Sequence, residues 1–265
     1  MSLRIAVLGA PGRMGRQVVE QVLRSDDLVL AAAIARDGSD LVGRDAGTLC
    51  GLEAGVPLTV VSDGLGQADV VVDFSLPEGT LAALPGLDGR PLVSGVTGFD
   101  TDALDTLHRY ASTGPLLHAA NFSTGVNVLL SLVAAAARAL PDFDIEIVEA
   151  HHTRKVDAPS GTALALGRAA AEARGWNLDA VRTDGRTGRV GARPHEQIGI
   201  HALRAGVITG HHEVWLAGPT EQVQLVHTAT SRDVFAAGAL RAARWIAGRA
   251  PGTYVMADVL GLSGA

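Results

Sequence analysis

The stretch that decides the fold is Leu3–Gly15, LRIAVLGAPGRMG. Its first six residues have the pattern of a buried strand, and they lead directly into glycines at positions 9, 12 and 15. Glycine permits a tight turn and lets backbone N–H groups approach a pyrophosphate at the N-terminus of the following helix. The stretch therefore predicts the opening strand, turn and helix of a Rossmann-type dinucleotide-binding unit.

Short apolar runs alternate with helical segments through the rest of the first half. The strands expected after Leu3–Leu8 are 28–34, 58–61, 70–73, 91–94 and 116–120. Ser75 and Glu78 have the spacing of a capping box with Pro77 in the first turn, so a helix is expected to begin there. Apolar strands alternating with helices predict a parallel sheet that is covered on both faces.

After Asn121 the pattern becomes that of an antiparallel or mixed sheet. Helices are expected at about 125–140, after Ser160 and at 234–248. Polar and apolar residues alternate at 144–149, and further strands are expected at 199–203, 213–216 and 222–228. Residues 181–197, which are rich in glycine and arginine, are expected to form a loop.

The predicted fold class is α/β, with an N-terminal Rossmann-type parallel sheet and a second α+β domain built on a mixed sheet. Residues 1–123 together with 234–265 are expected to form the dinucleotide-binding domain. Residues 124–233 are expected to form a domain for substrate binding and oligomerisation.

The composition excludes several classes of protein. A hydrophobic content of 47% in 265 residues rules out a disordered chain. The longest apolar run, 126–140, is shorter than the ~20 residues of a spanning helix, so no membrane is expected as a partner. The net charge of -6 argues against nucleic acid. A single cysteine, Cys50, and no visible export signal favour a cytoplasmic protein.

The end of the second expected strand bears on the choice of cofactor. NAD sites of this fold carry an acid there, ~20 residues beyond the glycines, that hydrogen-bonds the ribose. This chain has Ala35, Arg36 and Asp37 instead. A guanidinium beside the 2′ position favours a 2′-phosphate, so NADPH is the expected donor. Asp37 keeps NADH possible, and a solvated Arg36 in a loop is the alternative.

Polar residues are concentrated in 149–162, EAHHTRKVDAPSGT. Adjacent strand residues point to opposite faces, so His151 and His152 are poorly placed to bind one metal ion. No third ligand follows at a familiar spacing, and no metal is expected. The pair His211 and His212 has the same difficulty and is interpreted as structural.

Lys155 stands out because every other member of the 22 basic residues is an arginine. Lysine, unlike arginine, can lose and regain its proton when it is partly desolvated. Lys155 is therefore a candidate proton donor, four residues after His151. Ser160 has the form of a helix N-cap, and the free N–H groups beyond it would hold a carboxylate. Simple helix capping is the alternative.

Five segments together resemble the dihydrodipicolinate reductases of bacterial lysine biosynthesis. They are GAPGRMGR at 9–16, DFSLPEGT at 73–80, SGVTGFD at 94–100, AANFSTGVN at 119–127 and EAHHTRKVDAPSGTA at 149–163. The last is long and highly specific, and the resemblance covers nearly the whole chain. It implies a two-domain homotetrameric enzyme that uses NAD(P)H to reduce a cyclic dicarboxylate, 4-hydroxy-tetrahydrodipicolinate, to tetrahydrodipicolinate.

The resemblance also assigns roles to residues of this chain. It places the pyrophosphate on Gly9, Ala10, Pro11, Gly12, Arg13 and Met14, and the adenosine end on Arg36. It places the nicotinamide side on Gly95, Val96, Thr97, Ala119, Ala120, Asn121 and Phe122. It implies the acid–base pair His151 and Lys155, with substrate at His152, Gly161 and Thr162 beside the Ser160 cap. Ala35 departs from the family's usual acid, and Val96 from a common threonine.

Two other functions stay open at this point. The chain could be another Rossmann-type dehydrogenase of an amino or imino acid, such as a diaminopimelate or aspartate dehydrogenase. It could also be a non-catalytic dinucleotide-binding sensor, which would bind NADPH without turnover. The sensor hypothesis leaves the polar cluster at 149–162 unexplained.

Overall fold

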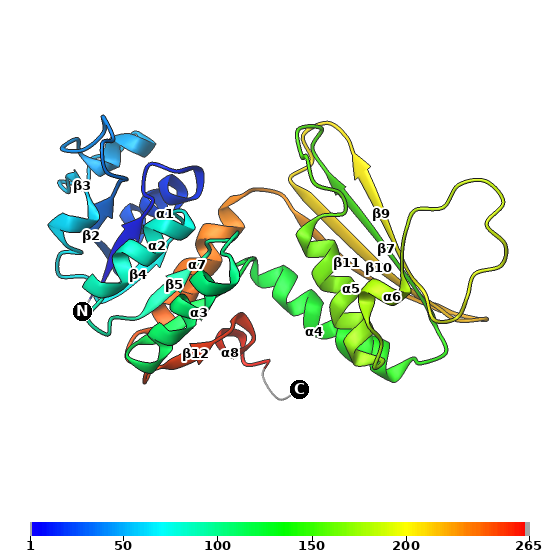
Figure 1. The fold of residues 1–265 in the computed structure, drawn as a ribbon. Coiled ribbons are helices and arrows are strands. Elements are labelled where there is room, and N and C mark those ends of the chain that lie inside the picture. The colour runs from blue at the N-terminus through cyan, green and yellow to red at the C-terminus, as the bar shows by residue number, and fades with distance from the viewer. Residues whose placement is uncertain (1, 263–265) are drawn as a thin grey trace. The chain divides into compact units, whose positions relative to one another are not determined.

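A computed structural model describes residues 2–262 of the chain. Met1 and positions 263–265, which belong to the ranges expected for the dinucleotide-binding domain, lie outside the described residues. The chain divides into two compact units, between Thr124 and Gly125 and between Arg232 and Asp233. The sequence analysis placed these divisions one residue earlier and one residue later. Each unit contains its own sheet (Figure 1).

The first unit is built on a parallel sheet of seven strands within the described residues. The strands are β1 (Leu3–Leu8), β2 (Leu28–Ile34), β3 (Leu58–Thr59), β4 (Val70–Asp73), β5 (Leu92–Ser94), β6 (Pro115–His118) and β12 (Gly252–Tyr254). Their order is β12-β6-β5-β4-β1-β2-β3, with every pair parallel. The chain thus winds outward from β1 in both directions, which confirms the Rossmann-type prediction.

Helices cover both faces of this sheet because alternate strand residues point to opposite sides. One face, with Val7 and Val72, packs against α1 (Arg13–Leu23), α7 (Asp233–Ile246) and α8 (Met256–Leu260). The other face, with Ala6 and Val71, packs against α2 (Pro77–Ala83) and α3 (Thr101–Arg109). Four short 3-10 helices complete the unit: η1 (Ala46–Cys50), η2 (Val61–Asp63), η3 (Leu84–Gly86) and η4 (Tyr110–Ser112).

The second unit is built on a mixed sheet, as the sequence predicts. Its strands are β7 (Asp144–His151), β8 (Arg182–Asp184), β9 (Ile198–Arg204), β10 (Gly210–Ala217) and β11 (Gln222–Ala229), in the order β11-β10-β7-β9-β8. The pairs of β9 with β7 and β8 are parallel, whereas β10 is antiparallel to β7 and β11. The helices are α4 (Thr124–Ala139), α5 (Gly161–Ala173) and α6 (Leu178–Val181).

The two faces of β7 have different surroundings. Ile145 and Ile147 point into a core formed with α4 and α5. Glu149 and His151 continue the same face, because strand residues two apart share a side. Glu146 lies on the opposite face. The apolar start of the strand therefore anchors its polar carboxyl end beside α5.

Three local predictions are wrong. The Ser75 capping box does not form, since the N-cap of α2 is Leu76 and the Ser75 hydroxyl donates to Asp73 instead. The expected loop 181–197 begins with the end of α6 and the strand β8. The strand β12 was not expected at all. Both missed strands are three residues long and are defined by pairing with distant segments.

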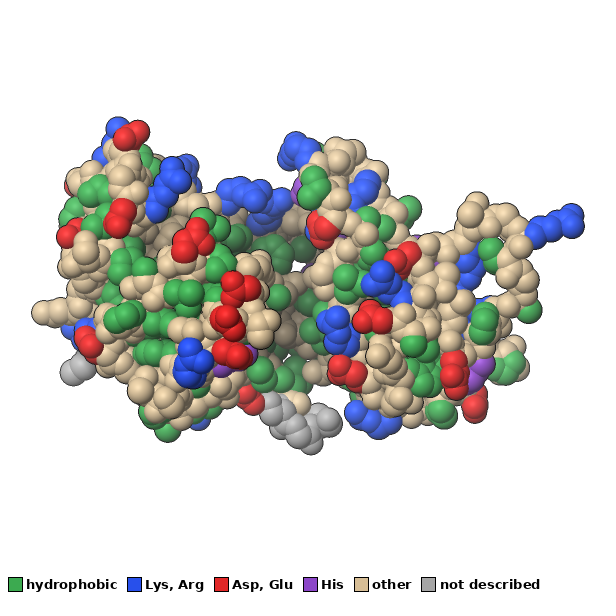
Figure 2. Space-filling view, in the orientation of Figure 1, with side chains coloured by type: hydrophobic (Ala, Val, Ile, Leu, Met, Phe, Trp, Pro, Cys, Tyr) green, Lys and Arg blue, Asp and Glu red, His purple; other side chains and the backbone are tan. Residues whose placement is uncertain are grey.

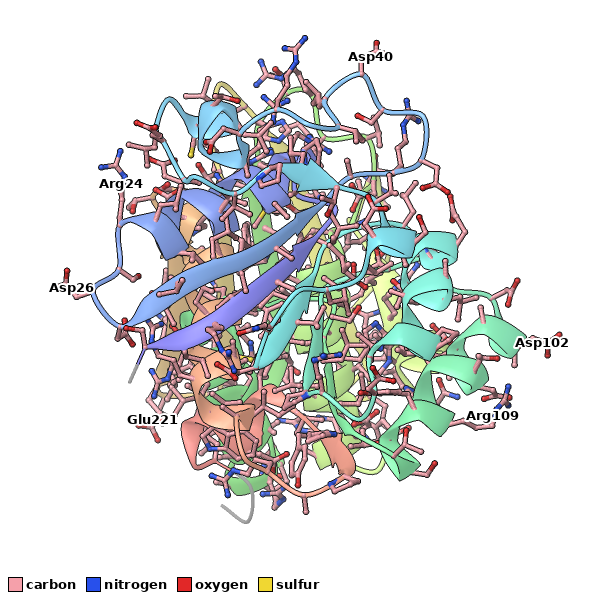
Figure 3. The ribbon with its side chains drawn as sticks, turned by 90° about the vertical axis from the view of Figure 1, so that its left-hand side faces the viewer. Arg24, Asp26, Asp40, Asp102, Arg109 and Glu221 are labelled. Atoms are coloured by element: carbon pink, nitrogen blue, oxygen red, sulfur yellow. The ribbon has the colours of Figure 1, made fainter. Side chains whose placement is uncertain are left out.

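Charged side chains are distributed over the surface. On the face shown in Figure 2, acidic and basic side chains are interspersed within each unit. In the first unit, Arg24, Asp26, Asp40, Asp102 and Arg109 point outward from loops and helix ends (Figure 3). Within residues 2–262, no helix combines the length and the apolar character needed to cross a bilayer.

Two glycines allow close packing around the turn between β1 and α1. Gly9 has a φ of 72°, and a Cβ there would lie 2.8 Å from the carbonyl oxygen of Phe74. Gly15 lies in the first turn of α1, where a Cβ would overlap the carbonyl oxygen of Gly9. The helix can therefore pack on the turn only because position 15 has no side chain.

Replacing Gly15 by alanine is expected to destabilise the protein by about 1–3 kcal/mol, because α1 must move away from the backbone of the turn. The matched control is Gly86→Ala, where an added Cβ meets nothing within 4 Å. Thermal unfolding of the two variants measures the difference. Equal midpoints for Gly15→Ala and Gly86→Ala would contradict the close-packing argument.

Candidate active site

A cavity of about 700 Å³ lies in the first unit, at the carboxyl ends of the central strands. Its lining comes from the glycine turn, the end of β2, and the segment after β4. The lining residues used below are Gly9, Pro11, Gly12, Arg16, Ala35, Arg36, Asp37, Phe74 and Ser75. In a doubly wound sheet, ligands bind at this edge, where the strand order reverses between β1 and β4.

The glycine turn has the geometry of a phosphate cradle. The Gly12 N–H donates to the carbonyl of Gly9 at 2.9 Å, and Ala10 N–H donates to Ile34 at 3.0 Å. Gly12 is also the N-cap of α1, and it has no side chain with which to cap the first-turn N–H groups. Those N–H groups and the positive end of α1 suit an anion.

Arg36 and Asp37 are both exposed, and both line the cavity. Ala35 beside them is buried and carries no acid. Arg16 also lines the cavity, and its Nε donates to the Pro11 carbonyl at 2.9 Å. Arg16 was not among the predicted site residues. The sequence could have indicated Arg16, because it lies one helical turn after Gly12 and its side chain therefore lies over the glycine turn.

Phe74 lines the cavity and also contacts residues that were predicted for the nicotinamide side. Its ring lies 5.8 Å from that of Phe122, edge to face, and a Cβ at Gly95 would overlap it. Asp73, the residue before Phe74, is fully buried and accepts hydrogen bonds from the Ser75 N–H at 2.9 Å and the Thr80 hydroxyl at 2.6 Å. Burial raises the pKa of Asp73 despite these bonds.

The structure brings only part of the predicted cofactor set into this cavity. Gly9, Pro11, Gly12 and Arg36 line it. The predicted residues outside its lining are Ala10, Arg13, Met14, Gly95, Val96, Thr97, Ala119, Ala120, Asn121 and Phe122. The last seven of these follow β5 and β6, whose carboxyl ends lie at the same edge of the sheet.

In the second unit, a buried carboxylate organises the predicted histidine–lysine segment. Glu149 is fully buried on β7. Arg204, on β9, donates to both of its oxygens at 2.8 Å. The backbone N–H of Ser160 donates to Glu149 Oε1 at 3.0 Å. Burial alone would raise the pKa of Glu149, but the hydrogen bonds from Arg204, His151 and Ser160 outweigh it and lower the pKa.

His151 is the second side chain bound to this carboxylate, after Arg204. Its Nδ1 donates to Glu149 Oε2 at 2.6 Å. The ring of His212 lies 5.2 Å away, edge to face, and His212 Nε2 is hydrogen-bonded to the Ser160 hydroxyl at 3.2 Å. Burial lowers the pKa of His212 to about 3, so this second histidine is neutral at ordinary pH.

His152 and Lys155 lie outside the buried cluster. His152 Nε2 accepts a hydrogen bond from Arg232 at 3.1 Å, on the other side of the strand from His151. Lys155 Nζ lies 2.8 Å from the Asp157 carboxylate and is one-fifth exposed. Arg204 joins the two regions, because it also donates to the Asp157 carbonyl at 2.6 Å. His151 and Lys155 are thus each held by a separate carboxylate.

Ser160 caps α5, as the sequence predicts: its hydroxyl accepts from the Ala163 N–H at 3.1 Å. Gly161 is exposed and Thr162 is half-buried in the first turn. Glu149 was expected only as part of the polar segment and without a role, His212 was interpreted as structural, and Arg204 was missed. Glu149 and Arg204 are 55 residues apart, so only the pairing of β7 with β9 brings them together. Residues 2–262 contain no group of three His, Cys, Asp or Glu side chains arranged for a metal ion.

Comparison with known proteins covers both units. A family model described as dihydrodipicolinate reductase, N-terminus, matches residues 3–122, and the corresponding C-terminus model matches residues 125–260. The 4-hydroxy-tetrahydrodipicolinate reductase of Alkalilimnicola ehrlichii is 50% identical, over 99% of this chain and 100% of that protein. The protein of the same name from Thiobacillus denitrificans is 49% identical, with the same shares covered.

Among solved structures, a dipicolinate-bound dihydrodipicolinate reductase from Paenisporosarcina sp. TG-14 has the same fold. The TM-score is 0.76 at 22% identity, over 97% of this chain and 99% of that chain. The dinucleotide-binding family model over the first unit and the reductase names of these relatives define the class as an NAD(P)H-dependent oxidoreductase. Within that class, the chain belongs to the dihydrodipicolinate reductase family. The sensor and the other dehydrogenases are therefore set aside.

Proposed function

We propose that this enzyme reduces 4-hydroxy-tetrahydrodipicolinate to tetrahydrodipicolinate in the diaminopimelate route to lysine. The observation that carries the proposal is His151, a buried histidine tied to Glu149 at 2.6 Å beside the N-terminus of α5. This arrangement places a proton-transfer group next to an anion-binding helix end, as a dicarboxylate substrate requires. The first unit holds the nucleotide, and the second holds the substrate.

The cavity of the first unit fits a dinucleotide. Gly9 and Gly12 leave its floor free of side chains, and the α1 N-terminus suits the pyrophosphate. Arg36, exposed at the end of β2, binds the 2′-phosphate of NADPH, which makes NADPH the preferred donor. Arg16 adds a second cation beside the turn. When bound, the reduced nucleotide supplies a hydride to the substrate ring.

The N-terminus of α5 holds one carboxylate of the substrate. The first-turn N–H groups at Gly161 and Thr162, the Thr162 hydroxyl and the helix dipole all favour an anion there. His152, on the other side of the strand from His151, is a further proposed contact of the substrate. The dipicolinate in the solved relative is a planar dicarboxylate, and its binding to that protein supports this assignment.

Protonation completes the reduction. Loss of the 4-hydroxyl together with one hydrogen of the neighbouring ring carbon, as water, gives a conjugated imine. Hydride addition to that imine leaves negative charge on the substrate, which then takes one proton. Lys155 and His151 supply the proton as a general-acid pair. Asp157 holds the Lys155 ammonium in place. The cationic groups also attract a doubly negative substrate.

We also propose that the chain assembles as a homotetramer through the second unit. Leu203 and Val226 are 55% and 53% exposed on the sheet face opposite to α4 and α5. Apolar side chains at such positions suit a subunit interface.

The proposed activity is tested by supplying the product of the preceding synthase and following NADPH and NADH absorbance separately. Turnover with that substrate is expected. Binding of NADPH without turnover would contradict the proposed function.

Replacing Arg36 by alanine should raise the KM for NADPH about tenfold or more while barely changing the KM for NADH. The reason is that a charge-assisted hydrogen bond of roughly 1.5–3 kcal/mol to the 2′-phosphate is lost. The control is Arg44→Ala, an exposed arginine outside the cavity lining. Equal losses with both cofactors would show that Arg36 does not read the phosphate.

Pyridine-2,6-dicarboxylate should compete with the substrate, and Thr162→Val should weaken that inhibition without changing the affinity for NADPH. The expected cause is the loss of one hydroxyl donor to the carboxylate. Losing a hydrogen bond of this kind typically weakens binding by at least about 0.5–1.5 kcal/mol. Thr101→Val, in the first turn of α3, is the matched control. Absence of any competition by the dicarboxylate would rule out the anion pocket.

Replacing Lys155 by arginine should lower kcat by roughly 10²–10⁴-fold, because arginine keeps the charge but does not release its proton. KM should change much less. Lys155→Ala should raise KM as well, since the substrate then loses a cationic partner. Arg154→Lys, the reciprocal exchange at an exposed neighbour, should leave kcat near that of the wild type.

A Lys155→Arg enzyme with near-normal kcat would contradict the proton-donor role. It would leave Lys155 as a binding charge and make His151 the candidate acid.

A further inference from the structure

We propose that Glu149, held by Arg204, is the positioning residue for His151: it fixes the imidazole so that proton exchange takes place only at Nε2. This inference rests on the proposed function, in which His151 belongs to the general-acid pair. Glu149 itself touches neither substrate nor cofactor in this proposal. It acts through the orientation and the tautomer of His151.

The hydrogen bonds of Glu149 account for all four of its favourable acceptor positions. Oε1 accepts from the Ser160 N–H at 3.0 Å and from Arg204 at 2.8 Å. Oε2 accepts from Arg204 at 2.8 Å and from His151 Nδ1 at 2.6 Å. The carboxylate is fully buried, so it cannot rotate without breaking several of these bonds. Its position relative to His151 is therefore set by three separate segments of the chain.

The hydrogen bond at Nδ1 of His151 determines the protonation of the other ring nitrogen, Nε2. With Nδ1–H donated to a carboxylate, Nε2 is left as the position that gains or releases a proton. Nε2 lies on the Gly210 side of the ring, where even an added Cβ would be 3.4 Å away. Among residues 2–262, no protein group is hydrogen-bonded to His151 Nε2.

The surrounding charges distinguish His151 from its neighbour. His212, 5.2 Å away, has no carboxylate partner within the described residues and stays neutral because it is buried. Arg204 keeps Glu149 ionised at the pH of the assay. Ser160, at the start of α5, contributes a neutral N–H. Within residues 2–262, the Glu149 carboxylate on His151 is thus the only negatively charged group hydrogen-bonded to either ring.

A control residue lies on the same strand. Glu146 is also held by arginines and a histidine: Arg186 at 2.7 Å, Arg193 at 3.0 Å and His201 at 2.7 Å. These bonds outweigh burial and lower the pKa of Glu146 to about 2. Glu146 lies on the opposite face of β7 and has no bond to His151. Its replacement removes a comparable ion-pair network without touching the proposed positioning.

The experiment compares Glu149→Gln with Glu146→Gln in the full chain. Glu149→Gln should lower kcat about 10–100-fold, by analogy with the loss of carboxylates that orient metal-bound histidines. The KM for 4-hydroxy-tetrahydrodipicolinate should stay within about twofold, since Glu149 does not touch the substrate. Glu146→Gln should lower the thermal midpoint but leave kcat unchanged.

A spectroscopic readout separates positioning from general destabilisation. ¹⁵N NMR of the His151 ring should show the Nδ1–H tautomer for the neutral ring in the wild type and in Glu146→Gln. In Glu149→Gln it should show a mixture of tautomers, because the amide can either donate to or accept from Nδ1. This readout does not depend on turnover, so it tests the pairing even if the proposed activity fails.

Arg204→Lys is the second variant if Glu149→Gln does not fold. Lysine keeps the charge but not the bidentate contact, so kcat should fall in the same direction with KM unchanged. The inference is overturned if Glu149→Gln or Arg204→Lys matches Glu146→Gln in kcat and in the His151 tautomer. A rise in KM with unchanged kcat would also overturn it, because Glu149 would then shape substrate binding.

Discussion

The carboxylate of Glu149 is the interaction on which the second unit's site depends. It joins β7, β9 and the start of α5 through Arg204 and the Ser160 N–H. A buried charge is tolerated only when every partner is present, and removing one partner of such a pair typically costs about 3–5 kcal/mol. The same four bonds that keep the carboxylate in the core also fix the ring of His151 and the first turn of α5.

The first unit also has a buried acid near the carboxyl end of a strand. Asp73 ends β4 and accepts hydrogen bonds from Ser75 and Thr80, and these bonds shape the segment that lines the cavity of the first unit. The hydrogen-bond partners of Asp73 are neutral, whereas Glu149 is bound by the charged Arg204. Neutral hydroxyls do not offset burial, so the pKa of Asp73 is raised, whereas Arg204 helps to lower that of Glu149. Asp73 organises a loop, and Glu149 also binds the ring of His151.

Local chemistry explains which features were predictable from sequence. The glycine turn after β1 and the Ser160 cap depend on neighbouring residues, and both formed as expected. The Ser75 capping box failed because Asp73, two residues earlier, competes for the same hydroxyl. Arg204 lies 55 residues from Glu149, so no pattern of neighbouring residues predicts their contact. Short strands such as β8 likewise exist only through pairing with distant segments.

The use of arginine and lysine follows from these contacts. Arg204 and Arg193 each reach several acceptors at once, including both oxygens of a carboxylate or neighbouring backbone carbonyls. Such contacts need the planar guanidinium group, which presents several N–H donors and stays charged. Lys155 instead meets a single carboxylate, that of the half-exposed Asp157. A lysine ammonium is compact and makes this contact without the planar geometry of a guanidinium, so the mechanism proposed above assigns the proton-donor role to the one lysine in a chain that otherwise uses arginine.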